Sequence, residues 1–89
     1  MSDFKKLEKL LKVAGNQRRL AILAYLKKVR VSSVGKISEN LNMSYHAASK
    51  HLRLLLNAEL LDREQKKFEA HYTLSKNQHR LVSNLLELL

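Results

Sequence analysis

Apolar residues recur every three or four positions along most of this 89-residue chain, and no proline interrupts them. That spacing places the apolar side chains on one face of a helix. We therefore expect five helices, at about residues 3–14, 17–28, 34–41 and 45–58 and from residue 76 to the C-terminus. Residues 60–74 differ, because strand-like alternation at 60–63 and 71–74 flanks a polar loop at 64–70. The sequence predicts a mainly α fold with one small β-hairpin.

Polar residues that can cap a helix stand before each predicted helix. They are Ser2 or Asp3, Asn16, Ser32 or Ser33, Ser44, and Ser75. Gly15 is expected to end the first helix in the left-handed conformation, and residues 29–31 are a candidate for a short β-bridge. The helix at 34–41, a tight turn at 42–43 and the helix at 45–58 together have the arrangement of a helix-turn-helix.

The charge of the chain points to a polyanionic partner. Seventeen Lys and Arg residues stand against eight Asp and Glu residues, which gives a formal net charge of +9. Such an excess favours nucleic acid or an anionic membrane surface, and the helix-turn-helix with its hairpin favours nucleic acid. Charges interrupt every apolar stretch, so none is long enough to span a bilayer. The length suits a single domain over residues 1–89.

Several segments resemble one family of regulators in their order and spacing. Residues 16–23 (NQRRLAIL) look like its DPTRLRIL segment, and residues 44–55 (SYHAASKHLRLL) are similar to its recognition segment, SQPTVSRHLKVL. Residues 58–61 match AGLV, with Glu59 where glycine is usual, and residues 64–74 look like the wing. Over nearly its whole length the chain resembles the ArsR-type winged-helix repressors of bacteria and archaea. The resemblance implies a winged helix-turn-helix, five helices in all, that binds DNA in a prokaryotic cytosol.

The outer face of the helix at 45–58 is the candidate DNA reader. Helical geometry turns Ala48, Leu52 and Leu55 inward, with His51 beside them in a packing role. The outer face then carries hydrogen-bond donors and cations without a carboxylate, as a helix in the major groove requires. Its N-terminal residues are expected at base edges, and Lys50 and Arg53 at either a guanine or a phosphate.

Lys66 and Lys67 lie at the tip of the predicted hairpin, where the resemblance implies a wing that follows the DNA backbone. Glu64 and Glu69 flank them and weaken their attraction to phosphate. Arg18 or Arg19 is a further candidate for a phosphate contact, and Arg19 equally for an internal ion pair. The predicted DNA-binding residues are Ser44, Tyr45, His46, Ser49, Lys50, Arg53, Lys66 and Lys67.

Both ends of the chain carry more apolar surface than one small core needs. In the first helix Phe4, Leu7, Leu11 and Ala14 form a stripe with Leu10 at its edge. Apolar surface of this extent indicates a partner, and a two-fold homodimer is the simplest arrangement. The predicted dimerisation residues are Phe4, Leu7, Leu11, Leu81, Leu85 and Leu88.

Metal binding and catalysis find no support in the residues. The chain has no cysteine, and residues 31–35 stand where the family's metal-thiolate motif lies. The zinc-sensing members place an Asp-x-His and a His-x-x-Glu on the last helix, whereas this one offers only His79 and Glu87. No nucleophile, base and acid occur together as an enzyme needs. We expect no metal, no cofactor and no enzymatic activity.

The sequence thus predicts a sequence-specific regulator of transcription, a repressor by family resemblance, that binds double-stranded DNA as a cytoplasmic homodimer. The alternative is a winged-helix module that binds protein or RNA instead of duplex DNA. A salt titration against duplex DNA and RNA distinguishes these possibilities.

Overall fold

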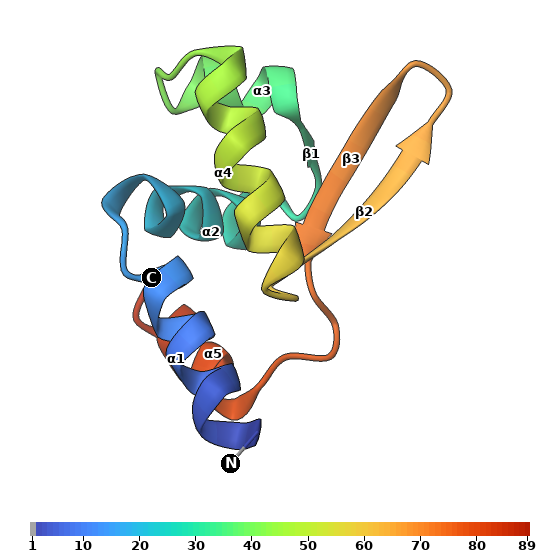
Figure 1. Cartoon of the computed structure of the whole chain (residues 1–89). Helices are drawn as coiled ribbons and strands as arrows, with labels where there is room; N and C mark the ends of the chain where they lie inside the picture. The colour runs from blue at the N-terminus through green and yellow to red at the C-terminus, as the bar shows by residue number, and fades with distance from the viewer. Residues whose placement is uncertain (1) are drawn as a thin grey trace.

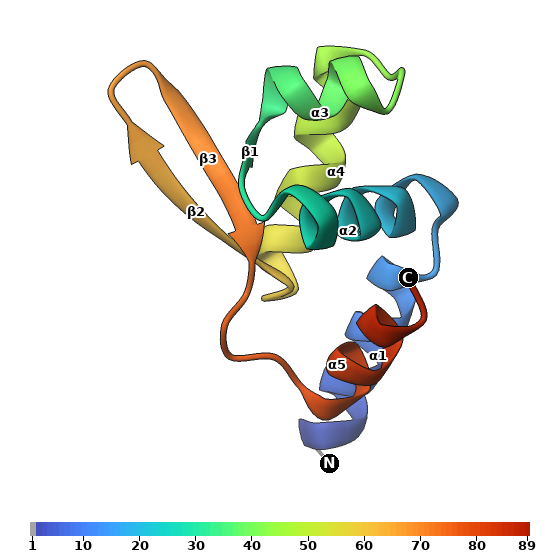
Figure 2. The same ribbon diagram turned by 180° about the vertical axis from the view of Figure 1, so that it is seen from behind.

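The computed structural model describes the backbone of residues 2–89 and the side chains of residues 4–89. Within these residues the elements are α1 (Ser2–Ala14), α2 (Gln17–Val29), β1 (Ser32–Ser33), α3 (Val34–Asn40), α4 (Tyr45–Asn57), β2 (Leu61–Lys66), β3 (Glu69–Leu74) and α5 (Arg80–Glu87). α2, α3 and α4 form the body, and the β2–β3 hairpin projects from it (Figure 1). α1 and α5 lie at the end away from the hairpin tip, also when the molecule is seen from behind (Figure 2). The predicted winged helix-turn-helix fold is confirmed.

The core forms around α2, as the density of apolar residues in that helix indicates. Ile22, Leu23 and Leu26 are completely buried. Against them pack Ile37 of α3 and the inner residues of α4, and Leu60, Leu61, Val82 and Leu86 close the cluster. Burying one large aliphatic side chain contributes about 1.5–3 kcal/mol. This core therefore fixes α4 in place and leaves its other face to solvent.

The first turns of the helices confirm three of the predicted caps. Asn16 Oδ1 accepts the backbone N–H groups of residues 18 and 19 at 3.0 and 3.1 Å. Ser33 Oγ accepts from the Lys36 amide at 3.3 Å, and Ser44 Oγ accepts from the Ala47 amide at 3.0 Å. The candidate caps Ser2 and Asp3 lie outside the described side chains.

The start of the last helix was predicted wrongly. α5 begins at Arg80, and the His79 Nδ1 atom accepts from the Leu81 amide at 3.0 Å, so His79 rather than Ser75 is the cap. The Ser75 amide instead donates to the Leu60 carbonyl at 3.0 Å. This bond holds the chain at the base of the hairpin, and the helix starts only after residues 75–79 have crossed to the α1 end.

The sheet has the strand order β1-β3-β2, and all its pairs are antiparallel. The bridge strand β1 lies at Ser32–Ser33 and pairs with Tyr72 and His71, not at residues 29–31 as predicted. The hairpin strands are also longer than predicted, because pairing continues to Lys66 and Glu69 and leaves a two-residue turn. The part of the hairpin nearest the turn shows no alternation of apolar and polar residues, because both of its faces are exposed. Its backbone hydrogen bonds form without an apolar face.

Two backbone positions correct the predicted use of glycine. Gly15 is not left-handed, since no glycine in the described residues has a positive φ. A β-carbon at position 15 would lie 2.9 Å from the Leu11 carbonyl oxygen, so close approach explains this glycine. Glu59 has a φ of 63°, in the region that favours glycine. That conformation accounts for the glycine usual at this position in the ArsR-type segment.

α1 packs on the core through Leu10, the residue that the sequence placed at the edge of the predicted stripe. Leu10 is 4% exposed and lies in the core, whereas Phe4 is 70% and Leu11 is 59% exposed. The predicted stripe therefore divides into two. Leu10 and Ala14 face the protein's own core, while Phe4 and Leu11 form an apolar flank open to solvent.

Candidate nucleic-acid interface

α4 presents the predicted inner and outer faces. Ala48, Leu52 and Leu55 are completely buried against the core. On the opposite side Tyr45, His46, Lys50 and Arg53 are exposed, Ser49 is half-buried, and Ser44 caps the helix with its own side chain exposed. The helix contains no Asp or Glu. Its outer face therefore offers donors and positive charge, together with the free N–H groups of its first turn.

A groove runs between the first turns of α4 and the inner side of the hairpin. Its lining comes from β1 and α3, from α4, and from both hairpin strands: Ser33, Val34, Gly35, Tyr45, Ser49, Arg63, Gln65, Phe68, Glu69, Ala70 and Tyr72. Arg63 Nη2 donates to Gln65 Oε1 at 3.0 Å, which holds two polar ends together on β2. Arg63, Gln65 and Phe68 are not among the site residues predicted from the sequence. Gln65 and Phe68 reach this groove because the antiparallel register continues beyond the predicted strands, and Arg63 reaches it from within the predicted strand.

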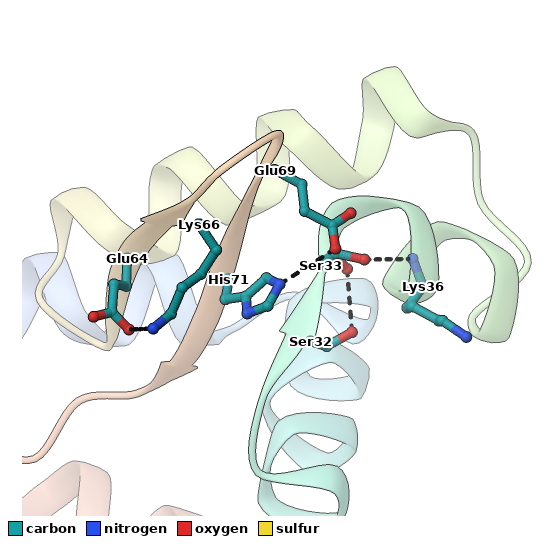
Figure 3. A network of polar contacts seen from close by, with 7 residues as sticks. All are labelled: Ser32, Ser33, Lys36, Glu64, Lys66, Glu69 and His71. Carbon is teal, nitrogen blue, oxygen red and sulfur yellow. Dashed lines mark hydrogen bonds and ion pairs between the residues drawn. The ribbon is translucent and has the colours of Figure 1, made fainter.

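The hairpin carries an ion pair and a further hydrogen bond between side chains, which Figure 3 shows with their neighbours. Lys66 Nζ lies 3.2 Å from Glu64 Oε1, and His71 Nε2 lies 3.2 Å from Glu69 Oε1. Lys67 lies in the turn with a φ of 43° and takes part in no ion pair of the described residues. Of the two predicted wing lysines, Lys67 is therefore the one that offers an uncompensated charge.

Arg19 has an internal role. Its Nε atom donates to the Val13 carbonyl oxygen at 2.7 Å, which joins α2 to the end of α1. The acceptor is a neutral backbone carbonyl, so Arg19 makes an internal hydrogen bond where one of the two expectations was an internal ion pair. Arg18, one residue earlier, is exposed.

His51 lies on the protein side of α4, beside this arginine pair. Burial, and then the positive charges of Arg19, Arg18 and Lys50, lower the pKa of His51 below its ordinary value of 6.5. Its Nδ1 atom is buried and has no hydrogen-bond partner. His51 is therefore held neutral in the folded protein, which fits the packing role predicted for it.

The predicted dimerisation residues fall into two groups. Phe4, Leu11 and Leu88 are strongly exposed, while Leu7, Leu81 and Leu85 are half-buried. All of them belong to α1 or to α5, or form the C-terminal cap of α5, as Leu88 does. These two helices lie at one end of the molecule in both views (Figures 1 and 2). α1 is also tied to α4, because Lys9 Nζ donates to the Asn57 carbonyl oxygen at 3.1 Å.

Among the described side chains, those of residues 4–89, no three His, Asp or Glu groups gather closely enough to hold a metal ion. Over the same residues, no helix combines the length and the apolar character needed to cross a membrane.

Known proteins resemble this chain in sequence and in geometry. Residues 16–63, from the cap of α2 into β2, match the family described as "Bacterial regulatory protein, arsR family". The transcriptional activator HlyU of Vibrio cholerae serotype O1 is 36% identical over 80 residues, which are 90% of this chain and 73% of that protein.

Two solved structures show the likeness in three dimensions. Reduced HlyU from Vibrio cholerae N16961 gives a TM-score of 0.83 at 35% identity and covers 99% of this chain and 88% of that one. The homodimeric winged helix-turn-helix DNA-binding domain of Mb0332 from Mycobacterium bovis gives a TM-score of 0.83 at 23% identity, over 98% of this chain and 77% of that one. The second likeness is one of fold alone.

Proposed function

We propose that this chain, which belongs to the ArsR family of bacterial regulatory proteins, is a single-domain, sequence-specific DNA-binding protein that works as a homodimer. The family is one of transcriptional regulators. For this chain we assign the residues that contact DNA and the arrangement in which two copies bind it.

The outer face of α4 is the observation that carries the proposal. It is exposed except at the half-buried Ser49, it holds no carboxylate, and it is backed by buried core residues. We place Tyr45, His46 and Ser49 at base edges, because they lie in the first turns, which enter the major groove deepest. Lys50 and Arg53 follow at a base or a phosphate. Ser44 and the wing residues Lys66 and Lys67 contact the backbone.

Homodimerisation supplies the second recognition helix. The apolar flank of Phe4 and Leu11 and the exposed Leu88 have nothing to cover them within one protomer. A two-fold dimer through α1 and α5, using also Leu7, Leu81 and Leu85, covers them and sets two copies of α4 about one helical turn of DNA apart, roughly 34 Å. The operator is then an imperfect palindrome. Mb0332, which shares the fold, is described as homodimeric.

We further propose that the dimer acts in a prokaryotic cytosol as a repressor, since a protein that occupies a promoter excludes others from it. HlyU is named an activator, so the choice between repression and activation needs its own test. A reporter gene downstream of the operator gives lower expression in the presence of the protein if it represses, and higher expression would contradict repression.

Selection of bound sequences from a random duplex pool, followed by salt titration, tests the proposal itself. The affinity should fall with a log–log slope of about −0.9 per phosphate neutralised. Arg53→Ala and Lys50→Ala should weaken binding, by about 1–3 kcal/mol with loss of sequence preference at a base contact. Lys28→Ala removes the same charge from the end of α2, behind α4 in Figure 1, and should change little. The absence of duplex binding at low salt, or equal binding of RNA, would overturn the proposal.

A further inference from the structure

Phe68 is the most exposed large hydrophobic residue of the described chain. Its side chain is 97% exposed, compared with 70% for Phe4 and 64% for Tyr45. A single exposed apolar residue needs no special explanation in itself. The position of Phe68 needs an explanation, because this residue forms half of the two-residue turn at the tip of the hairpin. There it packs against nothing and adds nothing to the core.

The turn itself holds a lysine in a backbone conformation that favours glycine or asparagine. Two-residue hairpin turns prefer Asn, Asp or Gly, since they need a positive φ. Here Lys67 takes a φ of 43° and Phe68 follows it. Lys67 is therefore poorly suited to its position, whereas Phe68, whose φ is not positive, is tolerated at the second position without being required there. Departures from local rules of this kind are expected at functional positions.

The surroundings of Phe68 identify the partner. It lines the same groove as Tyr45 and Ser49 of the recognition helix, and it directly follows the unpaired Lys67. The paired strands β2 and β3 hold this tip away from the body (Figure 1). A duplex whose major groove receives α4 therefore brings its adjacent minor groove to the hairpin tip, with Lys67 at the backbone and Phe68 at the groove.

We propose that Phe68 enters the minor groove beside the recognition site and packs on sugars and base edges, as an apolar wedge. Such wedges partly unstack a base step and bend the duplex. Flexible pyrimidine–purine steps cost least to deform. The residue thus adds a preference for such a step at a fixed distance from the half-site that α4 reads. This inference rests on the proposed DNA binding and assigns it a contact that does not depend on charge.

The comparison of Phe68→Ala with Lys67→Ala tests the proposal, on the selected operator and over a range of salt concentrations. Phe68→Ala should weaken binding roughly 10- to 100-fold, as expected for an aromatic ring that loses its burial, with an unchanged salt slope. Lys67→Ala should instead flatten the slope by about 0.9. Phe68→Leu, which keeps an apolar side chain, should recover part of the affinity. Because Phe68 is 97% exposed, circular dichroism should show all variants folded.

A second measurement reads the bend directly, from energy transfer between dyes at the ends of the operator. The wild-type protein should bend the duplex and Phe68→Ala should bend it less. Unchanged affinity and bend angle in Phe68→Ala, with the wild type bound normally, would overturn this inference alone. A wild-type protein that binds no duplex would overturn the proposed function as well.

Discussion

Leu11→Glu tests the proposed dimer without touching the core. Leu11 is 59% exposed in the protomer, so the variant protomer should fold. Full burial of a leucine contributes about 1.5–3 kcal/mol, and the exposed share of it is therefore about 1–2 kcal/mol. Because the two-fold axis places Leu11 of both protomers in the interface, the loss occurs twice. The free energy of dimerisation should therefore weaken by about 2–4 kcal/mol, which raises the dimer dissociation constant roughly 30- to 700-fold. Desolvation of the carboxylate adds to this loss.

Sedimentation over a series of concentrations measures the dissociation constant, and operator binding measured on the same samples should weaken with it. Ser83→Glu is the matched control, because it adds the same charge to an exposed position of α5. Ser83 lies on the side of that helix opposite to Leu81, Leu85 and Leu88 by helical geometry. A Leu11→Glu protein that dimerises like the wild type, or a wild type that binds its operator as a monomer, would refute the reasoning.

Three further predictions concern stability. Asn16→Ala removes the acceptor of two amides at the start of α2 and should cost about 1 kcal/mol in urea unfolding, whereas Asn16→Asp should cost less. Gly15→Ala should destabilise the protein, because the new β-carbon would lie 2.9 Å from a backbone oxygen; a raised midpoint would contradict this. His51 has a lowered pKa when folded, so the unfolded chain binds more protons and stability falls as the pH drops through about 6.5. His51→Leu should reduce that fall between pH 7.5 and 5.5, and an unchanged pH profile would exclude His51 as its source.

The inner face of α4 was predictable because it depends on a local rule. Ala48, Leu52 and Leu55 repeat at helical spacing, and burial follows from that spacing alone. The face of α1 was not predictable in the same way. Leu10 and Leu11 are adjacent and chemically alike, and only the packing of α1 on α2 and α4 decides that Leu10 is buried and Leu11 exposed.

The wing was located from the sequence, but its tip was described incorrectly. Residues 64–66 pair with residues 69–71. Their sequence does not alternate between apolar and polar residues, because both faces of this part of the hairpin meet solvent. Phe68 was overlooked for the same reason, since an apolar residue in a polar loop carries no periodic signal. The cap of α5 depended on a distant contact, namely the bond of the Ser75 amide to the Leu60 carbonyl.

The hydrogen bond from Lys9 to the Asn57 carbonyl links α1 to the C-terminal end of α4, so α1 and the body that carries α4 move together. α4 has 13 residues, so its tip lies about 20 Å from the end that α1 holds. A tilt of about 5° at the held end moves the tip by about 2 Å, more than half the rise of one base pair. In the proposed dimer, the angle at which the two copies of α1 pair would therefore set the distance between the two copies of α4. Replacements in α1 that touch no DNA should change which operator spacing is bound best.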